Sequence, residues 1–220
     1  MSEYIYRDAT IADIPFLVDV IIEAEKSGSN TIGLANIFEI DEYDLRNYLT
    51  QMLEEEIDGC EFSVSSFIIA EYEGLPVAGY GGWIEEENED NLPSFILKAN
   101  LFSYILPREK VLKLNNISEI IKGFLFAREP HTLHIEYLYV KPEHRGKGIP
   151  VNLYQKLIER AKKRNKFIKK SYVQGFEQNI ASIKAAQKAG YKIVKRIESK
   201  HPEILNYFPY NVILLLEKEL

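Results

Sequence analysis

The sequence has few of the residue types that cross-link small proteins or hold proteins in membranes. Cys60 is the only cysteine among 220 residues, which excludes an internal disulfide and a cysteine-built metal cluster. The four histidines show no metal-ligand spacing. No apolar run approaches the ~20 residues of a membrane-spanning helix, and the first residues lack the pattern of a signal peptide. We therefore expect a soluble cytoplasmic protein with no metal and no membrane contact.

Charge is divided unevenly along the chain, although the net charge is only −6. Residues 1–130 contain 25 acidic and 9 basic side chains, whereas residues 131–220 contain 8 acidic and 18 basic ones. This asymmetry indicates two ligands of opposite sign, unless the two halves interleave in space and their fields cancel. A basic run from Lys162 to Lys170 follows a predicted helix end and lacks interleaved aromatic residues. We interpret it as a solvated face and expect no nucleic-acid partner.

Apolar spacing and turn residues divide the first 130 residues into helices and strands. A strand over 3–9 precedes a helix that Thr10 and Asp13 cap and that Gly28 ends. The elements expected next are a loop over 28–40, a helix over 41–57, and a hairpin of strands 66–72 and 77–85. Acidic residues from Glu85 to Asp90 are expected to face solvent. Two short helices, 95–106 and 117–126, are expected within a long insertion over 86–130, which a compact domain tends to use as a lid or specificity element.

Strands and helices alternate from residue 131 onward. The expected elements are a strand over 134–140, a helix over 149–164, a strand over 171–176, a helix over 179–189, and strands over 190–198 and 210–218. This order predicts a mixed α/β sandwich. No repeat or linker divides the chain, so we expect a single domain over residues 1–220.

The most informative segment is the loop Arg145-Gly146-Lys147-Gly148-Ile149-Pro150, which joins a predicted strand to a predicted helix. The first turn of a helix has free N–H groups and partial positive charge, and glycine lets an anion approach the backbone. Such a loop is typical of a phosphate or pyrophosphate site. It lacks the lysine and hydroxyl pattern of nucleotide hydrolases, and Val151 replaces the third glycine of a dinucleotide fingerprint.

Several motifs in order make the sequence resemble the GNAT superfamily of acetyl-CoA-dependent N-acetyltransferases. They are Leu138-Tyr139-Val140-Lys141-Pro142, the loop from Arg145 to Pro150, Asn179 with Ser182, Gly190-Tyr191, and the opening Arg7-Asp8-Ala9-Thr10 with Asp13. The resemblance covers residues 3–85 and 131–220 but leaves out the insertion. It implies a mostly antiparallel central sheet with helices on both faces, and an insertion before the cofactor-binding strand.

The resemblance also implies where acetyl-CoA binds, as a co-substrate. Its arm would lie between strands 134–140 and 171–176 and pair with the backbone as an added strand does. The implied cofactor residues are Leu138, Tyr139, Val140, Arg145, Gly146, Lys147, Gly148, Ile149, Asn179 and Ser182. For Asn179, helix capping is an equally good interpretation.

Two positions depart from the family pattern. Pro150 occupies a signature position that is normally glycine or alanine, and proline removes one N–H donor, although the first helical turn accommodates it. Ala186 stands where the family usually has the tyrosine that protonates the leaving thiolate. Tyr207 and Tyr210, before the last strand, are the substitutes we consider.

Aminolysis of a thioester needs a group that takes a proton from the amine. Glu136 is the first candidate, because the family often carries a carboxylate on this strand. Simple alternation places Glu136 on one strand face with His134, Leu138 and Val140. A structural ion pair is the competing interpretation for Glu136. His134 is a second candidate base, although a structural histidine is the more common case.

These observations predict an N-acetyltransferase that acts on a primary amine of a small, cationic acceptor. The alternative is a non-catalytic acyl-CoA-binding sensor or interaction module with the same fold, which Pro150 and Ala186 favour. Residues 28–40 and 86–130 are expected to form the acceptor pocket. The sequence leaves the acceptor unnamed, and it leaves a homodimer open.

Overall fold

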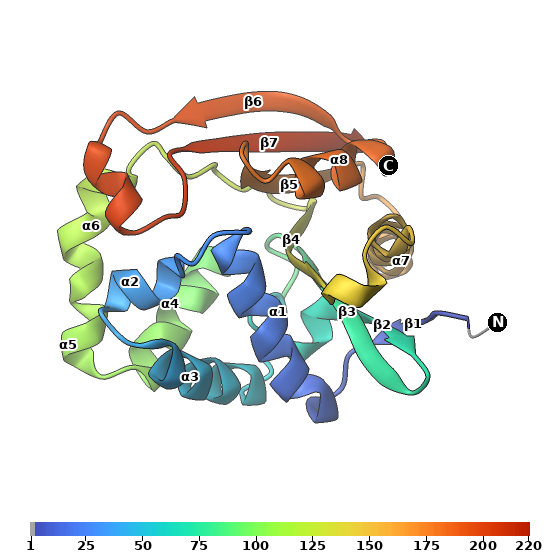
Figure 1. The fold of residues 1–220 in the computed structure, drawn as a ribbon, viewed down its shortest axis with the longest axis horizontal. Coiled ribbons are helices and arrows are strands. Elements are labelled where there is room, and N and C mark those ends of the chain that lie inside the picture. Colours follow the sequence, from blue (N-terminus) through green and yellow to red (C-terminus); the bar gives the residue numbers. More distant parts are fainter. Residues whose placement is uncertain (1–2) are drawn as a thin grey trace.

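A computed structural model describes residues 3–220, and a seven-stranded sheet runs through it (Figure 1). The strand order is β1-β2-β3-β4-β5-β7-β6, and every neighbouring pair is antiparallel except β4 and β5. The strands are β1 (Ile5–Asp8), β2 (Phe67–Tyr72), β3 (Leu75–Ile84), β4 (Leu133–Val140), β5 (Lys170–Phe176), β6 (Lys192–Glu198) and β7 (Val212–Glu219). The predicted mixed, mostly antiparallel sheet is therefore confirmed.

Helices cover both faces of the sheet, as expected (Figure 1). Those of the first face are α1 (Ile14–Lys26), α2 (Gly33–Phe38), α3 (Glu42–Glu54), α4 (Ser94–Ile105), α5 (Arg108–Val111) and α6 (Lys113–Ile121). The opposite face carries α7 (Ile149–Arg164) and α8 (Ile180–Lys188). Short 3-10 turns lie at η1 (Ile11–Asp13), η2 (Val64–Ser66), η3 (Pro142–His144) and η4 (Pro202–Asn206). No helix within residues 3–220 is long and apolar enough to cross a bilayer.

Two hydrophobic cores lie on either side of the sheet. One packs α1 to α4 against β2, with Leu17, Ile21 and Leu49 fully buried. The other packs α7 and α8 against β3, β4 and β7 around Leu153 and Leu157. A smaller cluster joins the end of the insertion to η4 and β7 and includes Phe124. Apolar periodicity along the chain sets these faces.

A β-bulge in the middle of β4 changes which residues share a face. Tyr139 pairs with Gly79 of β3 and Glu136 pairs with Gly81, so two β4 residues, Tyr137 and Leu138, stand opposite one β3 residue. Tyr137 has φ of 64°, in the left-handed region. Ile135, before the bulge, and Leu138, after it, therefore pack in the same core. The predicted common face of Glu136, Leu138 and Val140 is wrong, because the extra residue reverses the alternation.

Three further expectations are corrected. The predicted loop 28–40 contains helix α2, which buries Leu34, Ile37 and Phe38 although glycine begins it. Glu85 was expected in solvent but is 1% exposed. Its carboxylate accepts hydrogen bonds from Trp83 Nε1 and from the N–H and Oγ of Ser94. This buried carboxylate therefore has hydrogen-bond partners. The insertion holds three helices, α4 to α6, rather than two.

The predicted cap of the first helix is part of an ion pair. Asp13 accepts hydrogen bonds from Thr10 N at 2.8 Å and from two nitrogens of Arg7 at 2.7 and 2.9 Å. The Arg7 hydrogen bonds are the main reason that the pKa of Asp13 falls to about 2. This pair links β1 to the start of α1, next to a buried core.

Replacing Asp13 with asparagine should lower the free energy of unfolding at pH 7 by about 1–2 kcal/mol. A lowered folded-state pKa contributes stability above the unfolded pKa near 4, and that contribution is lost as pH falls through about 2. Urea denaturation at pH 7 and at pH 2.5 measures both values. Glu119→Gln, in a pair with Lys122 whose side chains are 80% and 74% exposed, is the control and should change nothing measurable. An equal loss for Asp13→Asn at both pH values would contradict the assignment.

Candidate functional site

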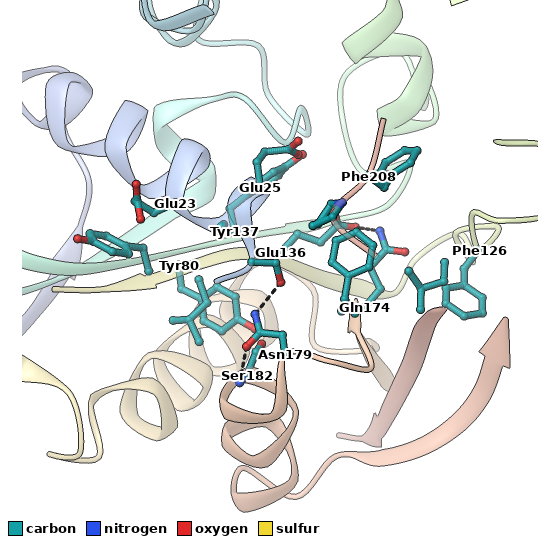
Figure 2. Close-up of a pocket in the computed structure, with 18 of the residues that line it drawn as sticks. Glu23, Glu25, Tyr80, Phe126, Glu136, Tyr137, Gln174, Asn179, Ser182 and Phe208 are labelled. Carbon is teal, nitrogen blue, oxygen red and sulfur yellow. Dashed lines mark hydrogen bonds between the residues drawn. The ribbon is translucent and has the colours of Figure 1, made fainter. Parts of the chain in front are cut away.

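The parallel strands β4 and β5 separate halfway along their length. They pair only between Leu133–Ile135 and Ser171–Val173. Beyond these pairs, the two strands are joined by side chains, since Gln174 Nε2 donates to Glu136 Oε1 at 2.6 Å. A cavity of about 1040 Å³ opens at this split (Figure 2). Its walls come from α1, α2, the insertion, β4, β5 and the starts of α7 and α8.

The predicted anion loop lies at one end of this cavity. Gly146 and Gly148 have φ of 76° and 78°, which other residues adopt only with strain, and Gly148 caps the N-terminus of α7. A Cβ at either position would meet no atom within 4 Å, so the space beside this backbone is open. Arg145 Nε donates to the carbonyl of Val140 at 3.0 Å and fixes the loop against the end of β4. The arrangement can cradle a phosphate group.

Most of the cofactor residues predicted from sequence meet at the cavity. Those that line it are Leu138, Tyr139, Val140, Arg145, Gly146, Gly148, Asn179 and Ser182. Lys147 does not line it, and Ile149 is fully buried in the core beneath α7. Pro150, the unusual signature residue, lies in the first turn of α7 and does line the cavity.

Asn179 has the capping role that the sequence analysis left open. Its side chain accepts a hydrogen bond from Ser182 N at 3.2 Å and so caps α8. Its amide nitrogen also donates to Ser27 Oγ at 2.7 Å, and Ser27 ends α1 (Figure 2). Asn179 therefore ties the two helices together across the cavity.

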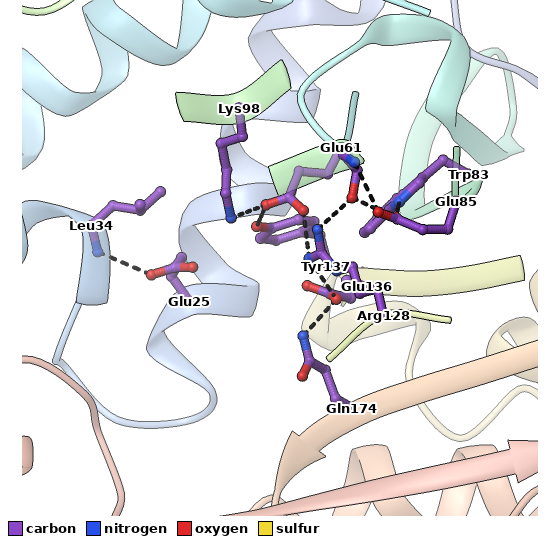
Figure 3. A network of polar contacts seen from close by, with 11 residues as sticks. Glu25, Leu34, Glu61, Trp83, Glu85, Lys98, Arg128, Glu136, Tyr137 and Gln174 are labelled. Carbon is purple, nitrogen blue, oxygen red and sulfur yellow. Dashed lines mark hydrogen bonds and ion pairs between the residues drawn. The ribbon is translucent and has the colours of Figure 1, made fainter. Parts of the chain in front are cut away.

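Glu136 belongs to a buried group of alternating charges (Figure 3). Arg128, from the end of the insertion, lies 3.0 Å from Glu136 Oε1 and 2.6 Å from Glu61 Oε2. Lys98 of α4 pairs with Glu61 as well, and Tyr137 Oη donates to Glu61 at 3.1 Å. Burial is the largest influence on Glu136 and raises its pKa. Burial opposes ionisation of Glu61, but its two cations dominate and lower the pKa of Glu61 to about 2.

Glu25, near the end of α1, is a residue that the sequence analysis missed. It lines the cavity, and its Oε2 accepts a hydrogen bond from Leu34 N at 3.1 Å (Figure 3). Burial raises the pKa of Glu25 to about 7, with smaller contributions from Glu61 and Glu136. Nothing in the local sequence distinguishes Glu25 from Glu23, its neighbour on the helix. The distinguishing partners come from α2 and the insertion.

The other predicted proton carriers lie elsewhere. His134 is buried between the rings of Trp83 and Tyr172, and burial together with Arg128 lowers its pKa to about 3, so it stays neutral. Tyr210 packs edge-on against Phe176, with ring centroids 5.7 Å apart. Tyr207 packs against the α1-side core. The cavity is lined here by Phe208 and Pro209, which lie between the two tyrosines.

Ala186 and Tyr191 both belong to the core. Ala186 is fully buried on the core-facing side of α8. The position where the family usually has its acid tyrosine therefore has no side chain that could reach the cavity. Tyr191 is 2% exposed, and its hydroxyl lies 2.7 Å from Ser171 Oγ. Tyr191 is thus a structural residue.

Both segments expected to form the acceptor pocket do line the cavity. Residues 28–40 contribute Gly28, Leu34, Ile37 and Phe38. The insertion contributes side chains from α4, α6 and the following segment, Phe124–Arg128 among them. Within residues 3–220, no group of three or more His, Cys, Asp or Glu side chains could hold a metal ion.

Comparison with known proteins identifies the family. The model of the acetyltransferase (GNAT) family matches residues 31–191, and the chain therefore belongs to that family. No curated protein matches the sequence significantly. Among solved structures, an N-acetyltransferase from Staphylococcus aureus Mu50 is 12% identical over 97% of this chain and 100% of its own, with a TM-score of 0.64.

Two further structures share the fold. A polyamine N-acetyltransferase from Drosophila melanogaster, which catalyses the formation of N-acetylagmatine, is 14% identical over 99% of this chain and 100% of its own, with a TM-score of 0.58. The protein yncA from Salmonella typhimurium, solved with its cofactor acetyl-CoA, is 13% identical over 99% of this chain and 94% of its own, with a TM-score of 0.52. These likenesses show the same fold.

Replacing Gly148 with glutamate should abolish the thermal shift that CoA produces, because it adds bulk and negative charge beside the loop backbone. The left-handed φ of 78° strains any side chain, so Gly148→Ala is the matched control. Alanine should lower the melting temperature of the free protein but keep most of the CoA shift, since its Cβ meets no atom within 4 Å. Equal CoA binding by wild type and Gly148→Glu would place the phosphates elsewhere.

Proposed function

We propose that the protein transfers the acetyl group of acetyl-CoA to a primary amine of a small, cationic acceptor in the cytoplasm. The single observation that carries this proposal is the arrangement along the split between β4 and β5. An anion-binding helix start lines the cavity, and the half-buried carboxylates of Glu25 and Glu136 line it as well. Such an arrangement suits a phosphate-bearing donor and an amine acceptor that meet at the split.

On the donor side, the pyrophosphate would lie against the backbone from Arg145 to Gly148. The pantetheine arm would follow the cavity-lining backbone of Leu138 to Val140 as an added strand. The excess of basic residues after residue 130 favours a donor with several phosphate charges. Family membership and the yncA structure with acetyl-CoA support the same donor.

On the acceptor side, Glu25 and Glu136 have different surroundings and so different tasks. Glu25 has a pKa near 7, which suits a general base at neutral pH. The Oε1 atom of Glu136 accepts hydrogen bonds from both Arg128 and Gln174, which fix the carboxylate in place. We assign proton removal to Glu25 and ammonium binding and orientation to Glu136.

The amine nitrogen would attack the thioester carbonyl carbon, and its proton would pass to Glu25 directly or through water. The C–S bond then breaks, and CoA leaves as a thiolate. A backbone N–H near Tyr139 would stabilise the oxyanion. A thiolate is a fair leaving group, so it can leave without a side-chain acid and take its proton from water; Tyr207 and Tyr210, the candidates from the sequence, do not line the cavity.

Two measurements test the function as a whole. A thermal shift with CoA tests donor binding, and release of free thiol from acetyl-CoA with a panel of primary amines tests transfer. We expect a CoA shift and thiol release that depends on an amine. A CoA shift without thiol release from any amine would favour the non-catalytic binding module, which the buried Ala186 also favours. No CoA shift would contradict both.

The two carboxylates can be separated by their pH profiles. Because Glu25 acts in its ionised form, kcat should rise as pH passes through about 7, and Glu25→Gln should remove that rise and lower kcat about 100-fold. Glu136→Gln should raise the KM for the amine about tenfold, keep the rise, and leave the thermal shift with CoA nearly unchanged.

Glu23→Gln is the matched control for Glu25→Gln. Glu23 lies two residues away on the same helix and lines the cavity, but its carboxylate pairs with Lys26 at 2.9 Å. This variant should keep the rise near pH 7. If Glu136→Gln removes the rise and Glu25→Gln keeps it, the two roles are reversed.

A further inference from the structure

The part of the cavity wall that the insertion contributes is mostly apolar. Six residues from α4, α6 and the segment after α6 form what we call the apolar wall: Phe102, Leu114, Ile117, Ile121, Phe124 and Phe126. Phe38 of α2 packs edge-on against Phe102, with centroids 4.9 Å apart, and extends this surface. A wall of this kind stabilises a ligand by removing apolar surface from water.

The cations that the insertion brings to the cavity already have partners. Lys98 pairs with Glu61, and Arg128 lies between Glu61 and Glu136 while stacking on Trp83 at 4.8 Å from its ring centroid. Glu61 is fully buried, so it is out of reach of a ligand. Because Glu61 is already paired with Lys98 and Arg128, it offers no carboxylate to a second cationic group on an acceptor that extends toward the insertion.

The carboxylate of Glu25 lies close to the aromatic residues of the cavity. A Cβ on Gly33 would lie 2.8 Å from Glu25 Oε2 and 3.6 Å from Phe208 Cδ1, so both groups border the same space. Phe208 and Phe124 pack together, with ring centroids 5.6 Å apart, so this surface is continuous with the apolar wall, and Figure 2 shows Phe126 farther from Glu25. A ligand held at Glu25 therefore has aromatic and aliphatic side chains beside it.

We propose that the acceptor is a primary amine with one cationic head and an apolar aromatic or alkyl body, rather than a diamine, polyamine or guanidinium compound. This inference rests on the proposed function. The ammonium group is held by Glu25 and Glu136, and the body lies against the apolar wall. A carboxylate beside an apolar surface matches such a molecule.

A long acyl chain on the donor is the other ligand that could cover an apolar wall. The amine is favoured by charge complementarity, because the carboxylate of Glu25 faces the same cavity and attracts an ammonium group but gains nothing from an acyl chain. Preference for a long acyl-CoA is accordingly an outcome of the test that would overturn the inference.

The test compares kcat/KM across acceptors and donors with the full chain. With acetyl-CoA, values should rise about fourfold per added methylene from ethylamine to hexylamine, and phenethylamine should exceed putrescine, spermidine and agmatine by about 100-fold. With hexylamine fixed, acetyl-CoA should be used at least as well as butyryl-CoA and octanoyl-CoA. A flat alkylamine series or better turnover of the polycations would overturn the inference and leave the proposed function standing, whereas a preference for octanoyl-CoA would overturn the inference and replace the acetyl group of the proposed function by a longer acyl group. If none of the amines causes thiol release, the result would instead contradict the proposed function.

Phe126→Ala tests the wall itself. The variant should lower kcat/KM for hexylamine and phenethylamine about tenfold while ethylamine changes less than twofold, which also shows that the protein still folds. Phe167→Ala is the matched control, because Phe167 is 75% exposed and does not line the cavity. Equal losses for ethylamine and hexylamine in Phe126→Ala would show that the body of the acceptor lies elsewhere.

Discussion

The bulge in β4 is the constraint on which the rest of the site depends. One extra residue at Tyr137–Leu138 bends β4 away from β5 after three paired residues, and the sheet opens between these two strands. The same residue reverses the side-chain alternation. Glu136 therefore faces the α1 side, whereas Leu138, two positions later, packs toward α7. A regular strand would have placed both on one face and closed the cavity with paired backbone.

An open split leaves polar groups in the interior, and the insertion supplies their partners. Glu61 and Glu136 are two buried acids, and Lys98 and Arg128 are two cations that come from the insertion to meet them. Removing Arg128 would leave Glu136 without a cation in the interior, which is far more destabilising than losing an exposed pair. The ion pair of Arg128 with Glu136 thus fixes the insertion to β4. It also holds the insertion in the place where its side chains line the cavity.

Local patterns predicted most helices and strands, because those features depend on neighbours in sequence. The loop at Gly146 and Gly148 and its helix follow from turn residues and apolar periodicity, whereas the mostly antiparallel sheet and the donor residues were expected from the resemblance to the family. The bulge, the buried Glu85 and the raised pKa of Glu25 depend on partners 9 or more residues away, such as Ser94 and Leu34. No pattern within one segment encodes such contacts, so Glu25 became a candidate only in three dimensions, whereas Glu136 and the two pocket segments were already candidates from the sequence.

The uneven charge along the sequence acquires a physical meaning at the cavity. Most acidic residues of the first 130 form surface ion pairs or face solvent, but Glu23 and Glu25 of α1 line the cavity (Figure 2). The loop of the basic half enters the same cavity through Arg145 and the start of α7. The two halves therefore do not cancel there. Acidic residues of the first half and basic residues of the second half therefore line one cavity. Among the described residues, the apolar wall is a large part of that cavity with no charged side chain, and the division of charge along the sequence does not account for it.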